Sequence, residues 1–300
     1  MSRRLQLLQV ARLARRSLGE SSDLVRRYLE SIEAPCGGYF DRVGRADLYY
    51  TSFALDALAA VDASPGGESA DRTVSFLRRH GDGEGLDLPH RGCLARAWAS
   101  FPGRLDPECR GRIVDHINRQ RAADGGYATR TGSARGTAYG SFLAVNALAD
   151  LGVPIAEGST EAESIVASIL SLRSADGGWS NEPDRPEGST TATASAAAVL
   201  ASLGRRVPDE AISWLLGRFH PAGGFTAAPE TPLPDLLSTA VAVHVLDLAG
   251  ADWRHLREGV LDFLDTLWTA DGGFHGSWAD DHPDAEYTYY GLVALGHASV

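Results

Sequence analysis

An acidic stretch near the end of the chain is the first place where residue types and spacing could do chemistry. Asp280, Asp281, Asp284 and Glu286 fall within seven residues. Such a group could hold Mg²⁺ for a diphosphate, supply the two carboxylates of a glycoside hydrolase, or form a solvated loop that ends in a helix N-cap. If Glu286 lies in a dry aromatic pocket, with Asp284 beside it, desolvation would favour the neutral form of its carboxyl group, which is the form a general acid needs.

A glycine pair followed by an aromatic residue recurs along the chain and sets its organisation. The second glycines of successive pairs are 88, 52, 46 and 49 residues apart, and the Gly83–Gly85 stretch lies where the long first step would hold a degenerate copy. A period of this length predicts one supersecondary unit copied six times. The pairs read CGGY, DGGY, DGGW, AGGF and DGGF, at residues 36–39, 124–127, 176–179, 222–225 and 271–274.

Each repeat predicts two helices of different character. Segments 161–173, 208–219 and 256–268, which precede glycine pairs, carry apolar residues at helical spacing on one face, as half-buried helices do. Segment 189–203, which follows a pair, is almost free of charge and predicts a helix buried on all sides. Six such hairpins can close into an all-α, α6/α6 toroid with the buried helices in its inner ring; an open solenoid is the alternative.

The inner helices are predicted to begin at one level, around the mouth of a central funnel. We align them on a first residue that is mostly Asp, Ser or Glu, and Asp and Ser are good N-caps. Five of the six segments then carry threonine four residues later. The residues two and three places after the first residue are predicted to line the funnel. The aligned first residues are Asp47, His90, Ser133, Glu187, Asp235 and Asp284.

The glycine-aromatic repeat and the inner-helix starts resemble the superfamily of protein prenyltransferase β subunits and class II terpene cyclases of the squalene-hopene type. The resemblance covers about residues 20–300 and implies the α6/α6 toroid. It implies no single activity, because this toroid also serves other chemistries.

The catalytic motifs of both branches are altered in this chain. The cyclases use a D-x-D-D-T-A motif whose middle Asp protonates an alkene or epoxide, but residues 234–240 read PDLLSTA, with Leu237 in place of the acid. In the last repeat, residues 283–288 read PDAEYT and put Glu286 at the equivalent position, so the resemblance implies Glu286 as the catalytic general acid, with Asp284 as a second catalytic candidate. The prenyltransferases bind zinc through Asp, Cys and His; Leu237 and Tyr287 replace the Cys and the His, so zinc is not expected. Mg²⁺ at the acidic stretch is the one cofactor left open.

The resemblance and the aromatic residues together predict an isoprenoid-handling enzyme, cyclase-like or transferase-like, that acts on a polyprenyl chain or its diphosphate without zinc. The rings would stabilise a carbocation through their faces, and Arg135 would meet the anionic end of the substrate. The alternatives are plain core packing of the aromatics, a non-catalytic toroid that binds a lipid or a protein, and an α6/α6 glycoside hydrolase. The other predicted substrate-binding residues are Tyr49, Tyr50, Phe53, Trp98, Tyr139, Phe142, Asp235, Tyr287 and Tyr290.

Residues 1–19 differ in character from the single toroid domain predicted over residues 20–300. Five arginines alternate with leucine and valine, which predicts a basic amphipathic helix. This helix either packs on the toroid or touches an anionic membrane or a partner protein. The segment lacks the apolar stretch and small-residue cleavage site of a secretory signal.

The amino-acid composition argues against some classes of binding partner and indicates the cellular compartment. A net charge of −11 with no lysine argues against nucleic-acid binding, which needs a basic surface. No window approaches about 18 uninterrupted apolar residues, so no membrane-spanning helix is expected. The three cysteines form no evident disulfide framework and favour a reducing compartment. We therefore expect a cytoplasmic protein, peripheral to a membrane if the N-terminal helix binds one.

Overall fold

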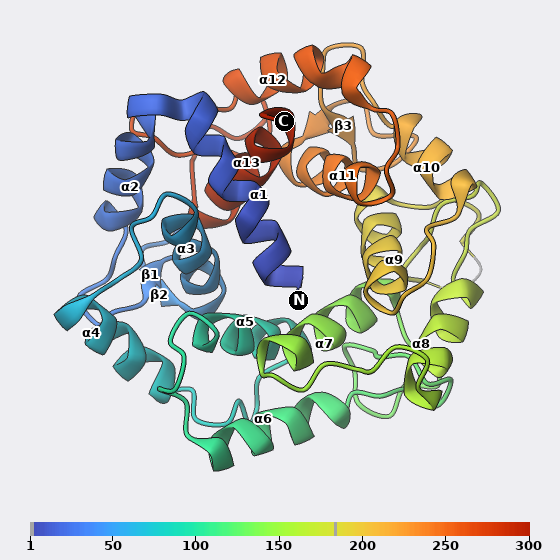
Figure 1. The fold of residues 1–300 in the computed structure, drawn as a ribbon, viewed down its shortest axis with the longest axis horizontal. Coiled ribbons are helices and arrows are strands. Elements are labelled where there is room, and N and C mark those ends of the chain that lie inside the picture. The colour runs from blue at the N-terminus through green and yellow to red at the C-terminus, as the bar shows by residue number, and fades with distance from the viewer. Residues whose placement is uncertain (1–2, 183–184) are drawn as a thin grey trace.

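The helices form a closed double ring (Figure 1), in a computed structural model that describes residues 3–182 and 185–300. In this part of the chain, inner and outer helices alternate in sequence. The inner helices are α3 (Leu48–Ala60), α5 (Leu88–Trp98), α7 (Ala138–Asp150), α9 (Thr190–Ser202), α11 (Leu236–Leu248) and α13 (Ala285–Ala298). The outer helices are α2 (Ser22–Ser31), α4 (Gly67–Arg78), α6 (Pro107–Asn118), α8 (Thr160–Ser171), α10 (Asp209–Leu216) and α12 (Arg257–Asp265).

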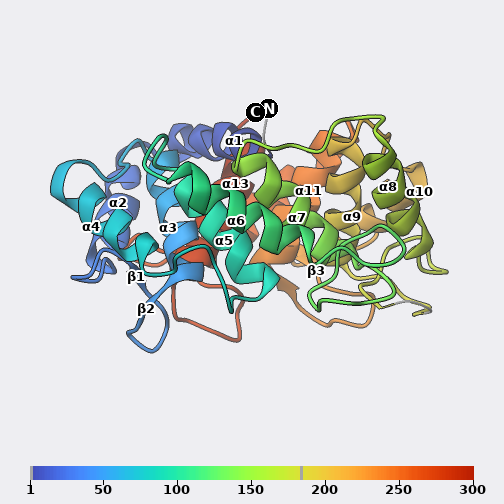
Figure 2. The same ribbon diagram turned by 90° about the horizontal axis from the view of Figure 1, so that it is seen from below.

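Short strands and long loops gather on one face of the ring, and a further helix lies on the opposite face (Figure 2). The strands form two antiparallel pairs, β1 (Tyr39–Phe40) with β2 (Ala46–Asp47) and β3 (Phe225–Thr226) with β4 (Pro234–Asp235). β2 and β4 lead directly into α3 and α11, so the strand face is the one at which the inner helices begin. Single 3₁₀ turns, η1 (Gly19–Ser21) and η2 (Arg254–Leu256), precede α2 and α12.

The predicted α6/α6 toroid is confirmed, and it is a closed ring rather than an open solenoid. The last inner helix, α13, packs against the first, α3. In each glycine pair the first glycine has a positive φ and lies close to the next outer helix. The last pair closes the ring in this way: Gly272 has φ +96° and lies against the backbone of Leu24 in α2.

Gly272→Ala is expected to lower the free energy of unfolding by roughly 2 kcal/mol, because the new side chain is both strained and overpacked. A Cβ there would lie 2.4 Å from the carbonyl carbon of Leu24. Gly132→Ala is the matched control, since Gly132 also has a positive φ, +74°, but has no atom within 4 Å of the added Cβ. Urea unfolding measures both variants. If Gly272→Ala and Gly132→Ala lowered the free energy of unfolding equally, this would contradict the close packing of Gly272 where the ring closes.

The register predicted for the inner helices is right in three repeats and wrong in the other three. Asp47, Asp235 and Asp284 are N-caps, as expected. The other N-caps are Asp87, Thr137 and Ser189 in place of the predicted His90, Ser133 and Glu187. In each of these six caps the side-chain oxygen accepts a backbone N–H of the first helical turn, which a misplaced start would leave unpaired.

A buried hydroxyl four residues after the N-cap joins each of five inner helices to its glycine pair. Thr193, for example, accepts the backbone N–H of Trp179 at 2.9 Å. The same bond links Thr239 to Phe225 and Ser141 to Tyr127. The threonine pattern in the sequence reports this hydrogen bond in three of the repeats. In the repeats of α7 and α9 the aligned Thr137 and Thr191 do not make it, because Thr137 is the N-cap and Thr191 lines the cavity, and Ser141 and Thr193 take their place. Thr51 and Thr288 make the bond in the first and last repeats.

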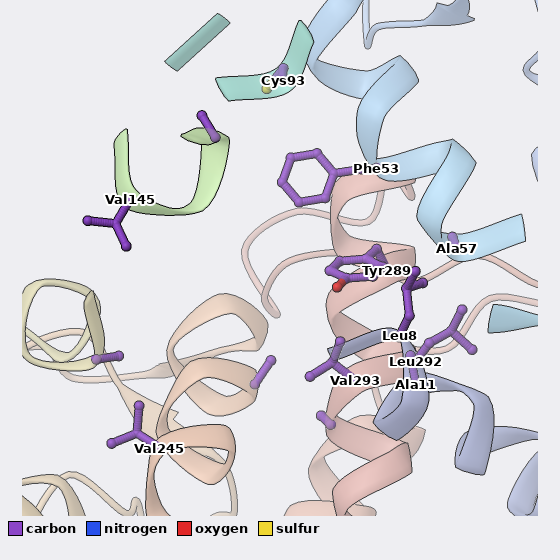
Figure 3. Close-up of a cluster of buried hydrophobic side chains, with 14 of the residues drawn as sticks. Leu8, Ala11, Phe53, Ala57, Cys93, Val145, Val245, Tyr289, Leu292 and Val293 are labelled. Atoms are coloured by element: carbon purple, nitrogen blue, oxygen red, sulfur yellow. The ribbon is translucent and has the colours of Figure 1, made fainter. Parts of the chain in front are cut away.

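The segment before the toroid forms α1 (Arg3–Leu18), which lies across one end of the central space (Figures 1 and 2). Its apolar face is buried, and Leu8 and Ala11 lie beside Leu292 of α13 (Figure 3). Arg3 and Arg4 at its start are also buried, 6% and 9% exposed. The helix thus packs on the toroid, which is one of the two predicted interpretations.

The exposed side of α1 carries the remaining arginines. Arg15 and Arg12 both pair with Asp62, which follows α3, and Arg16 faces solvent. Contact of this side with a membrane or a partner protein stays a prediction, as does the division of the chain at residue 19. Met1 and Ser2 of that segment lie outside the described residues. None of the described helices has both the length and the apolar character needed to cross a membrane.

Candidate active site

The centre of the ring holds a cavity of about 360 Å³, within the size range of small-molecule sites. Each inner helix turns one face to it. Counted from the N-cap, most of the side chains that line it lie two, five or six, and nine or ten residues into their helices, as helical periodicity requires. The cavity therefore has three layers, a mouth on the strand face, a middle, and a closed end that Arg3, Arg4 and Leu7 of α1 complete.

Glu286 lies in the mouth layer and forms a short hydrogen bond there. The Tyr49 hydroxyl donates to Glu286 Oε1 at 2.6 Å, so α3 and α13 meet through this pair. Tyr139 of α7, Thr191 and Leu237 line the same layer. Tyr139 is 36% exposed, which marks the point where the cavity opens to solvent.

The surroundings of Glu286 hold its carboxyl group ready to carry a proton at neutral pH. Burial, together with the negative charge of Asp284, raises the pKa of Glu286 to about 7, although the hydrogen bond from Tyr49 opposes the shift. A pKa near the working pH is what a general acid requires. Glu286 is thus the titratable group at the mouth that suits acid catalysis.

The middle layer is aromatic on one side. Phe53 of α3 and Tyr289 of α13 lie side by side, with ring centroids 5.7 Å apart (Figure 3). Tyr290 packs on Phe53 at 5.5 Å. Phe142 of α7 and Cys93 of α5 continue this wall. Ring faces of this kind can stabilise a cation in a space that excludes water.

A buried ion network lies behind the aromatic layer. Asp56 of α3 is fully buried and accepts hydrogen bonds from Arg4 Nε at 2.7 Å and from Arg96 Nε at 2.5 Å. The Arg96 guanidinium also lies 4.3 Å from the ring centroid of Phe53 and 4.5 Å from that of Tyr289. The network ties α1, α3 and α5 together and fixes the orientation of the aromatic wall.

A chain of polar groups runs from the closed end of the cavity to the surface. His244 Nδ1 lies 3.0 Å from His297 Nε2, and His297 Nδ1 lies 3.1 Å from a carboxylate oxygen of Asp247. Asp247 also accepts from Arg254. A carboxylate can only accept, so His297 Nδ1 carries a hydrogen, and in the neutral ring its Nε2 accepts from His244. His244 Nε2 is then left as an acceptor, facing Arg3 NH1 at 3.3 Å.

The structure brings half of the predicted site residues into the cavity wall. These are Glu286, Tyr49, Phe53, Tyr139, Phe142 and Tyr290. Their catalytic and binding roles stay predictions.

The other six predicted residues lie elsewhere. Tyr50 and Tyr287 are three residues past their N-caps, where helical geometry turns the side chain away from the cavity. Arg135 is exposed in the loop before α7, because Thr137 rather than Ser133 caps that helix. Trp98 is buried in the core outside the cavity. Asp235 and Asp284 face the helix ends that they cap.

Sequence reasoning missed the polar residues of the closed end, including Arg3, Arg96 and His244. They lie nine residues after an N-cap or on α1, so a search confined to the first helical turn could not reach them. One signal was available: the N-caps Thr137, Ser189, Asp235 and Asp284 all follow the second glycine of their pair by 11 residues (137−126, 189−178, 235−224, 284−273). That spacing gives the correct register, and hence the cavity face.

The acidic stretch divides into parts with different roles. Arg42 pairs with both Asp280 and Asp284, and Asp284 is 5% exposed. Among the described residues, the one group of acidic, His or Cys side chains close enough to share a metal is Asp280, Asp281 and His282, on an exposed loop. It lies apart from Glu286 in the sequence and outside the cavity wall.

The residues at the zinc positions of the prenyltransferase branch do not fit zinc. Leu237 offers no ligand atom. The Tyr287 ring lies against Arg42, whose guanidinium carbon is 5.4 Å from the centroid of that ring. Asp235 holds Ser238 through both its backbone N–H and its hydroxyl.

A comparison with protein families matches this chain over residues 100–208 and 193–298 to the family described as "Prenyltransferase alpha-alpha toroid domain". The chain belongs to this prenyltransferase alpha-alpha toroid family. The two matched segments overlap and together span the last four repeats. A comparison with curated proteins found no match.

Solved structures of several activities share the fold of this family member at low sequence identity. A type II terpene cyclase from Scytonema, in complex with its product merosterolic acid A, is 16% identical, with a TM-score of 0.67 over 95% of this chain and 97% of that chain. Protein geranylgeranyltransferase-I from Candida albicans, complexed with GGPP, is 15% identical, with a TM-score of 0.68 over 91% and 90%. An α-1,6-mannanase from Salegentibacter sp. is 15% identical, with a TM-score of 0.64 over 94% and 98%. These likenesses establish the fold alone.

Proposed function

We propose that this protein is an enzyme that acts on an isoprenoid chain, or its diphosphate, held in the central cavity, with Glu286 as the general acid. The observation that carries the proposal is the carboxyl group of Glu286, hydrogen-bonded by Tyr49 in an aromatic cavity, with a pKa of about 7. A protonated carboxyl group beside aromatic faces suits a reaction that creates a cation by proton transfer.

The proton of Glu286 would move to a basic atom of the substrate. With an epoxide, the new O–H bond forms as a C–O bond breaks, and the positive charge is left on carbon beside Phe53 and Tyr290. The glutamate remains as a carboxylate that the Tyr49 hydroxyl stabilises. Loss of a proton from a neighbouring carbon to water then leaves a neutral product, and Glu286 takes a proton back from solvent. A pKa near 7 suits an oxygen acceptor, such as an epoxide or ester oxygen, better than an isolated alkene carbon.

Two relatives support the choice of an isoprenoid. The Scytonema cyclase has been solved with geranylgeranyl dihydroxybenzoate as substrate, and the Candida transferase with GGPP. Both proteins have the toroid fold and both ligands carry a prenyl chain, which fits the apolar and aromatic wall of this cavity.

The cavity of about 360 Å³ favours a small-molecule site over a protein-binding scaffold, and the carboxyl group of Glu286 in its wall supports an enzyme over a toroid that only holds a lipid. It also argues against glycoside hydrolysis. The carboxylates in the described wall are Glu286 and Asp150, two and 13 residues past their N-caps. That difference separates them by roughly 16 Å along the helices, whereas glycosidases need about 5–10 Å.

Incubation of the purified protein with farnesyl diphosphate, geranylgeranyl diphosphate, squalene and oxidosqualene tests the proposal. We expect a new product from at least one substrate, detected by gas chromatography and mass spectrometry, and far less of it from Glu286→Gln. Absence of binding and turnover for every substrate, with the wild type and Glu286→Gln indistinguishable, would rule the proposal out.

A further inference from the structure

The closed end of the cavity contains more positive than negative charge. Arg3, Arg4 and Arg96 all line it, from α1 and α5. Asp56 pairs with Arg4 and Arg96 together, so one carboxylate serves two guanidinium groups. Asp150, at the end of α7, also lines the cavity and makes an interaction of its own.

Arg3 is the group at this end that lacks an ionic partner within residues 3–182 and 185–300. It donates to the carbonyl oxygen of Ala198 at 2.6 Å and approaches His244 Nε2 at 3.3 Å. Both partners are neutral, since burial lowers the pKa of His244 well below its usual value. Arg3 itself is 6% exposed, and its burial lowers its pKa to about 10. A cation held only by neutral acceptors in a dry site gains most from an anion.

The position of Arg3 is fixed by its neighbours. Arg4 anchors the start of α1 to Asp56 and also donates to Ser100 Oγ at 2.7 Å. Arg3 thus reaches the cavity from a held backbone. Between its layer and Glu286 the wall is mainly apolar and aromatic over about 10 Å, the rise of seven helical residues. The cavity is therefore an apolar channel with a proton donor at one end and a cation at the other.

We propose that Arg3 binds the anionic head group of the ligand, a phosphate or a carboxylate, at the α1 end of the cavity, so that the isoprenoid tail points toward Glu286. This inference rests on the proposed function and assigns α1 to the binding site. It also gives the role first predicted for Arg135 to a residue from the other end of the cavity. The guanidinium fork suits both head groups, because it donates two parallel hydrogen bonds to paired oxygens.

Isothermal titration calorimetry with farnesyl diphosphate, farnesoic acid and farnesol separates the head group from the tail. We expect the wild type to bind at least one of the two anions roughly 10- to 100-fold more tightly than farnesol, as charge-assisted hydrogen bonds would produce. Arg3→Gln keeps donors for Ala198 and should lose this preference, while its affinity for farnesol stays within about twofold of the wild type. Arg3→Lys keeps the charge without the fork and should fall between the two.

Arg16→Gln is the matched control, since Arg16 lies on the exposed side of the same helix, and it should retain the full preference. Preference for farnesyl diphosphate alone would identify the head group as phosphate, and preference for farnesoic acid alone as carboxylate. If Arg3→Gln keeps the preference of the wild type, or if the wild type binds farnesol without preferring an anion, the inference is wrong and the proposed function stands. If none of the three ligands binds, the inference is wrong as well, and the product assay with all four substrates then decides the proposed function separately.

Discussion

Replacing Glu286 with glutamine is expected to remove about 2.5 kcal/mol of pH-dependent stability between pH 5 and pH 8 and to lower turnover by roughly 10²- to 10⁴-fold. The folded-state pKa of about 7 lies above the ordinary value of 4.5, so the folded protein holds this proton more tightly than the unfolded chain does. The stabilisation is therefore complete below pH 4.5 and is lost as the pH rises through 7. Glutamine stays neutral and keeps an oxygen for the Tyr49 hydroxyl.

The measurement is the free energy of unfolding in urea at pH 5 and pH 8, compared between the wild type and Glu286→Gln. Taking the difference between the two proteins removes the contribution of the histidines, which titrate in the same range. Glu258→Gln, on the exposed side of α12, is the control and should follow the wild type. Tyr49→Phe removes a bond that favours the carboxylate, and should move the loss of stability to higher pH. A wild type whose stability differs from that of Glu286→Gln by a constant amount across this range would contradict the raised pKa.

Asp56→Asn is expected to destabilise the protein by about 3 to 5 kcal/mol, because it leaves two guanidinium groups buried without a counter-charge. Arg4 and Arg96 both depend on this one carboxylate, which is 0% exposed. The loss should also release α1, since Arg4 is its anchor inside the toroid. We expect the amides of α1 to exchange hydrogen faster in the variant, while those of the outer helices keep their protection.

Asp62→Asn is the matched control for this prediction. Asp62 also pairs with arginines of α1, Arg12 and Arg15, but at the surface, with 55% of its side chain exposed. Exposed pairs of this kind contribute about 1 kcal/mol or less. Equal losses for Asp56→Asn and Asp62→Asn would show that burial of the network does not matter, contrary to the structure.

The repeat architecture could be predicted from the sequence because its determinants are local. Gly37 and Gly272 adopt a positive φ that glycine reaches without strain, and the following aromatic residue packs within the same repeat. Helical periodicity distinguishes half-buried outer helices from buried inner ones over about 13 residues. These signals act within one repeat, so the helical hairpin can be predicted from each copy separately. The family match agrees with the predicted toroid.

The residues at the mouth of the cavity could be predicted in part. The errors in that prediction arose where the N-cap of an inner helix was assigned to the wrong residue. Glu286 and Tyr49 are each two residues past a correctly identified N-cap, and the structure joins them. Arg135 was misplaced because Ser133 and Thr137 are both acceptable caps by residue type. The choice between them depends on the loop that returns from the glycine pair, where the Thr137 N–H donates to the Tyr127 carbonyl.

The sequence by itself thus determined the toroid, its six repeats and an acid at the mouth, because short-range periodicity and backbone conformation encode them. The tertiary structure alone decided the closed end of the cavity. Arg4 and Asp56 are 52 residues apart, and Arg3 and Ala198 are 195 apart. No pattern within one repeat records such contacts, since they arise only when the ring closes and α1 covers its centre. Closure also keeps water from Arg3 and Glu286, and this desolvation shifts the pKa of both groups.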